Sequence, residues 1–105
     1  MQFVWVGLAS GDHNECAKYD PVRDEWTRVL APREQTARGG SSMIWTGREM
    51  IVWGGVDVSS GTGRVRNNGW RYDPQREVWS TVSTDGAPSP RTAHVAVWTG
   101  TDMIV

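Results

Sequence analysis

The side chains best suited to chemistry in this chain are two histidines, a single cysteine and scattered arginines and carboxylates. The segment Asp12-His13-Asn14-Glu15-Cys16 places a histidine, two carboxylates and the thiol close together, and its His-x-x-Cys spacing could supply two zinc ligands. No second ligand pair follows at such a spacing, and His94 falls in a different predicted strand. We therefore expect a solvated polar loop here, with no metal and no other cofactor.

A second segment, Ser59-Ser60-Gly61-Thr62-Gly63-Arg64, is rich in glycine and ends in a cation, which weakly suggests phosphate binding. It lacks the Lys-Ser/Thr of a phosphate-binding loop, and no helix is predicted after it. A flexible connection between two strands is the better interpretation. No Ser-His-Asp, Cys-His or paired-carboxylate arrangement is indicated anywhere, so the sequence does not predict an enzyme.

Three residues remain as candidate binding residues: Arg38, Arg91 and His94. The two arginines lie 91 − 38 = 53 residues apart, each at the entrance to a predicted strand. A rotationally repeated fold would set them around one end of a central channel, where planar guanidinium groups could bind an anion or an acidic peptide. In the structural alternative, which we favour, each arginine caps backbone carbonyls or pairs with a nearby aspartate. His94 could face the same channel.

Length and charge bound the class of protein. At 105 residues the chain is at most one domain, and its net charge of −1 gives no electrostatic attraction to nucleic acid or to an anionic membrane. No apolar run approaches the roughly 18 residues of a membrane span. The N-terminus lacks the basic region and apolar core of a signal peptide, so the sequence predicts a soluble protein and leaves its compartment undetermined.

The elements that position these residues are predicted to be strands. Two apolar runs, 43–45 and 50–53, flank Thr46-Gly47-Arg48-Glu49, which is a hairpin signature in which Gly47 can take the positive φ of a tight turn. Neither run alternates apolar with polar residues, so we expect both faces of both strands to be buried.

The sequence repeats with a shift of 72 − 19 = 53 residues. Tyr19-Asp20-Pro21 recurs as Tyr72-Asp73-Pro74, and Trp45-Thr46-Gly47 as Trp98-Thr99-Gly100. Of the 34 positions from 19 to 52, 13 are identical in the second copy. Each unit is predicted to hold four short strands, which fall in the complete copy at 40–46, 50–54, 69–72 and 78–82. The decline in apolar character from the first strand to the fourth predicts that the fourth lies at a solvent-exposed edge.

A repeat of about 50 residues with four antiparallel strands matches the arithmetic of a β-propeller blade. The apolar run followed by Gly54-Gly55, Tyr72-Asp73-Pro74 and Trp79 resembles the kelch repeat, in a form similar to that of many bacterial proteins. The fold class is therefore predicted to be all-β, a partial propeller of about two blades. Residues 1–39 would hold strands two to four of one blade, residues 40–83 a complete blade, and residues 84–105 the start of a third.

Two blades leave apolar faces uncovered, because a propeller normally has four to eight. We expect either self-association, in which three copies give about six blades, or further blades from a longer parent chain. The resemblance implies a non-catalytic binding or scaffold module whose loops contact a protein or a carbohydrate. The alternative is part of a kelch-propeller enzyme such as a sugar oxidase or a sugar epimerase.

Overall fold

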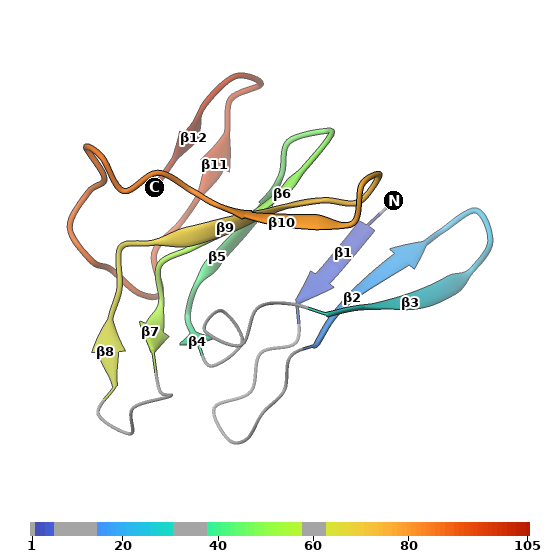
Figure 1. The fold of residues 1–105 in the computed structure, drawn as a ribbon, viewed down its shortest axis with the longest axis horizontal. Coiled ribbons are helices and arrows are strands. Elements are labelled where there is room, and N and C mark those ends of the chain that lie inside the picture. Colours follow the sequence, from blue (N-terminus) through green and yellow to red (C-terminus); the bar gives the residue numbers. More distant parts are fainter. Residues whose placement is uncertain (1, 6–14, 31–37, 58–62) are drawn as a thin grey trace.

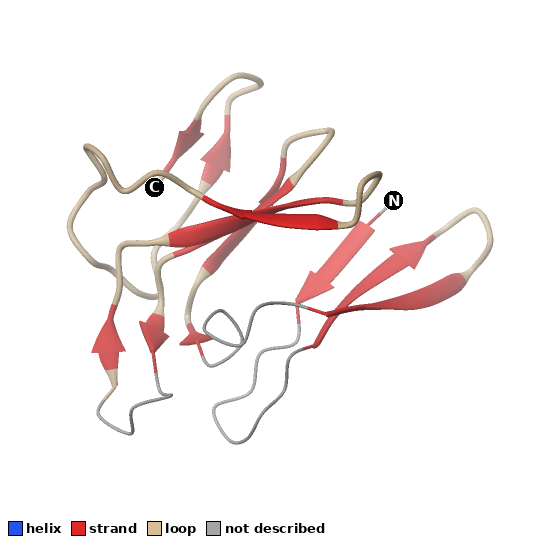
Figure 2. Cartoon of the chain, viewed as in Figure 1, coloured by secondary structure: helices blue, strands red, loops and turns tan. Residues whose placement is uncertain are grey.

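The structure is a computed structural model that describes residues 2–5, 15–30, 38–57 and 63–105 (Figure 1). All the regular structure within these ranges is strand, arranged in antiparallel sheets (Figure 2). The predicted all-β class is therefore confirmed. The described part of the chain contains no helix, and so no helix long and apolar enough to cross a membrane.

The central element is a four-stranded antiparallel sheet in the order β10-β9-β6-β5, in which β7 and β8 lie between β6 and β9 in the sequence but belong to another sheet. Its strands coincide with the four predicted ones: β5 (Ser42–Trp45), β6 (Met50–Trp53), β9 (Gly69–Asp73) and β10 (Val78–Thr81). The first strand is shorter than the predicted range 40–46. The polar strand β10 lies at one edge of the sheet, which agrees with the expected decline in apolar character along the unit.

The flanking repeat units are incomplete versions of the same sheet. Three strands pair in the order β1-β2-β3, and these are β1 (Gln2–Trp5), β2 (Glu15–Asp20) and β3 (Glu25–Leu30). A hairpin is formed by β11 (Val97–Trp98) and β12 (Met103–Ile104). In Figure 1 the central sheet lies between these two parts.

One small sheet was not predicted. It joins β4 (Arg38–Gly39), β7 (Val56–Asp57) and β8 (Arg64–Val65) in the order β4-β7-β8. Two of its strands, β7 and β8, lie in the connection between β6 and β9, where the sequence suggested only a flexible loop.

Corresponding residues of the two repeat units make corresponding bonds in the turn between the third and fourth strands. Asp20 Oδ1 accepts from the backbone N–H of Val22 at 2.9 Å, and Asp73 Oδ1 accepts from that of Gln75 at 2.9 Å. Each aspartate also accepts from the backbone N–H three residues on, at 3.3 Å. These are Asx turns, and they explain why Asp-Pro recurs at this position.

The core lies between the sheet β1-β2-β3, called the first sheet from here on, and the central sheet. Val29 of β3 is 5% exposed and packs with three central-sheet residues, Met50, Val52 and Tyr72. Met50 and Val52 are both 1% exposed or less. The same face of the central sheet carries half-buried Trp79, which lies directly opposite Tyr72 with the ring centroids 4.7 Å apart. One face of the first sheet therefore covers one face of the central sheet.

The expectation that both strands of the hairpin at 43–53 are buried on both faces is correct for most of β6 and wrong for the end of β5. Strand β6 is buried along most of its length, but Trp45 at the end of β5 is 37% exposed. In the hairpin of the third unit, Val97 is 52% and Ile104 is 56% exposed. A continuous apolar run indicates burial only where a sheet covers each face, and this hairpin has a neighbouring sheet on one side.

Candidate functional site

The structure brings two of the three predicted binding residues, Arg91 and His94, to the junction between the central sheet and the third unit. The backbone of this segment docks on the double glycine: Gly55 N–H donates to Arg91 C=O at 2.9 Å. Nearby, Ala93 N–H donates to Gly40 C=O at 2.9 Å. The third candidate, Arg38, pairs through its backbone with Asp57 in the small sheet, and its side chain lies outside the described part of the structure.

The guanidinium of Arg91 is used locally. Its Nε donates to the backbone carbonyl of Ser89 at 3.2 Å, and Nη1 lies 3.5 Å from the carbonyl of Val105. Nη2 donates to the Ser89 hydroxyl at 3.4 Å. These bonds cap backbone carbonyls, so they favour the structural alternative for Arg91 over an anion site.

His94 is held on the central sheet by polar and aromatic contacts. Its Nε2 lies 2.9 Å from the hydroxyl of Ser42, and its ring stands edge-on to Trp53 with the centroids 5.3 Å apart. The other ring nitrogen, Nδ1, is buried and has no hydrogen-bond partner among the described residues. Burial, assisted by the positive charge of Arg91, lowers the pKa of His94. The ring is therefore a neutral packing element of the junction.

This lowered pKa predicts a pH-dependent stability. The unfolded chain binds a proton on His94 more readily than the folded chain does, so the stability contributed by the neutral ring is lost as the pH falls through about 6.5 and below. We expect the urea midpoint to fall on moving from about pH 7.5 to about pH 5.5. The His94→Gln variant should show a smaller fall in its midpoint. An equal fall in both proteins would contradict a neutral, partly buried His94.

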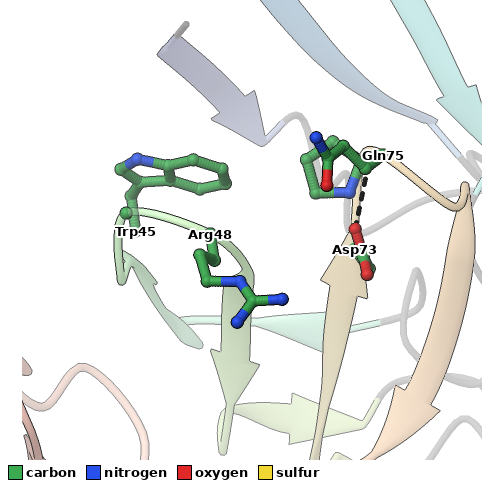
Figure 3. A pocket seen from close by; sticks show the side chains of 6 residues that line it. Trp45, Arg48, Asp73 and Gln75 are labelled. Atoms are coloured by element: carbon green, nitrogen blue, oxygen red, sulfur yellow. Dashed lines mark hydrogen bonds between the residues drawn. The ribbon is translucent and has the colours of Figure 1, made fainter.

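A pocket outside these residues is the better candidate for a binding site (Figure 3). It has a volume of about 230 Å³ and lies between two turns at the same end of the central sheet. The turn between β5 and β6 contributes Trp45, Gly47 and Arg48, and the turn between β9 and β10 contributes the segment 73–75. The two turns meet because β6 pairs with β9, with Met50 opposite Tyr72.

Each wall of this pocket is fixed by local hydrogen bonds. In the first turn, Thr46 Oγ1 accepts from the backbone N–H of Glu49 at 3.0 Å and from that of Arg48 at 3.3 Å. In the second turn, Asp73 is held by its Asx turn, while its Oδ2 lies 3.9 Å from Arg76 Nε. Figure 3 shows Trp45 and Arg48 on one side and Asp73 and Gln75 on the other.

The chemistry of the pocket is that of non-covalent recognition. Trp45 supplies an exposed aromatic surface, Arg48 supplies donors, and Asp73 and Gln75 supply acceptors and an amide. The described residues contain no group of three or more His, Cys, Asp or Glu side chains that could hold a metal ion. His13 of the possible zinc pair and residues 59–62 of the glycine-rich segment lie outside the described residues.

This pocket was not predicted from the sequence, because its two walls are about 25 residues apart in the chain. The available signal was that Trp45 and Asp73-Pro74 end neighbouring strands of one predicted sheet. Such a pocket needs all four strands of a unit. The third-unit counterpart of Trp45 is Trp98, whose hairpin has no third and fourth strands beside it in the described structure.

A scan of the chain against protein-family models finds no match.

Proposed function

We propose that this chain is a non-catalytic binding module of the kelch type, made of about two blades of a β-propeller. Support comes from the 53-residue repeat, from the four-stranded antiparallel sheet that the complete unit forms, and from the face-to-face packing of neighbouring units around Val29 and Tyr72. Further blades complete the propeller, supplied either by other copies of the chain or by a longer parent chain.

The binding site of this module is the pocket between Trp45 and the segment 73–75, which we call the Trp45 pocket. Its ligand is a carbohydrate. The observation that carries this proposal is the combination of an exposed indole with a guanidinium, a carboxylate and an amide around about 230 Å³. An indole face packs against the C–H groups of a sugar ring, while the polar side chains form hydrogen bonds with its hydroxyls. The volume is below the roughly 300–1,000 Å³ of pockets for drug-sized ligands, so it suits a single sugar ring.

The test is a binding screen on a panel of immobilised neutral and acidic oligosaccharides, with proline-rich and acidic peptides as a second panel. We expect binding to at least one oligosaccharide, weakened about tenfold or more in Trp45→Ala, because about 1.4 kcal/mol of lost stacking corresponds to a factor of ten. The matched control is Trp98→Ala, which removes the corresponding tryptophan of the third unit and should bind as the unsubstituted chain does.

Two results would overturn the carbohydrate proposal. One is binding confined to the peptide panel, which would make the pocket a peptide site. The other is oligosaccharide binding that Trp45→Ala and Trp98→Ala weaken equally, because the pocket would then not be the site of contact.

A further inference from the structure

The two outer faces of this set of sheets are apolar and exposed. On the first sheet, Trp26 is 60% exposed and lies directly opposite Tyr19, with the ring centroids 4.9 Å apart. We call this pair the Trp26 face. On the third unit, Val97 lies directly opposite Ile104, and both are more than half exposed. We call this pair the Ile104 face.

The Trp26 face has a covered counterpart within the same molecule. The shift of 53 residues carries Tyr19 and Trp26 to Tyr72 and Trp79 of the central sheet. There the tyrosine is 4% exposed and the tryptophan is half-buried, because Val29 of the first sheet packs on this face. The structure thus shows what covers a face of this composition: the opposite face of another repeat unit.

The Ile104 face is equivalent to the faces that cover a neighbouring repeat unit elsewhere in the molecule. Side chains alternate between the two faces of a strand, so Val29 points away from Trp26, three residues earlier on β3. On the central sheet the face opposite Tyr72 carries Ile44 and Ile51, which correspond to Val97 and Ile104 after the same shift. That central face is turned toward the third unit, because His94 contacts Ser42 and Trp53, which lie on the same face as Ile44 and Ile51.

The repeat units therefore stack with the same orientation at both junctions. The face opposite Trp26 in the first unit meets the Tyr72 face of the second, and the Ile51 face of the second meets the third unit. Continuing this order by one step places the Ile104 face of one molecule against a Trp26 face. The net charge of −1 opposes such contact between identical chains only weakly.

We propose that the chain associates head to tail with a second copy of itself, with the Ile104 face of one copy packed on the Trp26 face of the next. Such an interface joins two different surfaces, so it generates rings or open chains and not two-fold symmetric dimers. This inference rests on the stacking of repeat units in the proposed function and is independent of the ligand of the Trp45 pocket.

The test is sedimentation velocity over a range of protein concentrations. We expect the average mass of the unsubstituted chain to rise with concentration beyond that of a dimer. Trp26→Arg and Ile104→Asp should each abolish this rise, because each places a charge in one half of the interface. The matched control is Val22→Asp. Val22 is 93% exposed in the turn between β2 and β3, outside both faces, so this variant should associate as the unsubstituted chain does.

Mixing the two interface variants gives the sharper test. Trp26→Arg retains the Ile104 face and Ile104→Asp retains the Trp26 face, so an equimolar mixture should form dimers and nothing larger. Near-ultraviolet circular dichroism of each variant verifies that the tryptophans remain packed. A monomeric unsubstituted chain at every concentration, or dimerisation of Ile104→Asp alone, would overturn the head-to-tail interface.

The oligosaccharide screen separates this inference from the proposed function. A monomeric chain that still binds through Trp45 would contradict only the assembly. A chain that assembles as described and shows no binding on either panel would contradict only the carbohydrate site.

Discussion

Met50→Ala is expected to lower the free energy of unfolding by about 2–5 kcal/mol, the usual range for truncating a fully buried methionine. Met50 is 0% exposed, and it packs with Val29 from the first sheet as well as with Val52 and Tyr72 of its own sheet. Its removal leaves a cavity at the junction of two repeat units. Urea denaturation followed by tryptophan fluorescence measures the change.

The repeat supplies a matched control for this substitution. Met103 occupies the corresponding position in the third unit, where it is half-buried in a two-stranded hairpin. Met103→Ala removes the same atoms and should cost clearly less than Met50→Ala. Equal losses would mean that the core is not centred between the first sheet and the central sheet.

Gly55→Ala is expected to have the second large effect. Gly55 has φ +92°, where an L side chain is strained, and a Cβ there would lie 2.7 Å from the carbonyl oxygen of Gly39 and 2.9 Å from the backbone nitrogen of Ser41. The backbone strain costs about 1–2 kcal/mol. The overlap with backbone atoms adds about 1–3 kcal/mol, the usual range for overpacking.

Gly47→Ala separates these two contributions. Gly47 has a similar φ of +99°, but nothing lies within 4 Å of the position that its Cβ would occupy. This variant should therefore show the strain without the overlap. If Gly47→Ala destabilises the chain as much as Gly55→Ala, the overlap of the new Cβ with the segment 39–41 adds nothing to the destabilisation caused by backbone strain.

Most of the strand arrangement was predictable from the sequence, because the two copies of the repeat constrain each other. Asp20 and Asp73 mark the same turn, and their side chains make the same backbone hydrogen bonds in the structure. Gly47 and Gly100 have φ values of +99° and +105° at equivalent hairpin turns. A local signal that appears twice with a fixed offset is much stronger than either occurrence alone.

The features that could not be predicted from the sequence depend on contacts between segments that are distant in the chain. The Trp45 pocket needs the segment 73–75 beside it, and the exposure of Ile104 depends on whether a sheet lies on its outer side. The sheet β4-β7-β8 was not predicted because two-residue strands carry too little periodicity to recognise. Arg91 and His94 were predicted from the sequence as candidate binding residues, but their placement at a junction depends on the hydrogen bond from Gly55 N–H to the Arg91 carbonyl, which no sequence pattern indicates.

The burial of Val29 by the next repeat unit has a consequence during synthesis of the protein. Val29 is covered by Tyr72, which the ribosome adds 72 − 29 = 43 residues later. The strand that carries Val29 can pair with its neighbours early, but its apolar face stays open to water until the central sheet has formed. Each unit therefore covers the apolar face of the one before it. As a result, the nascent chain becomes less accessible to proteases and less prone to bind chaperones in steps of one repeat, from the N-terminus onward.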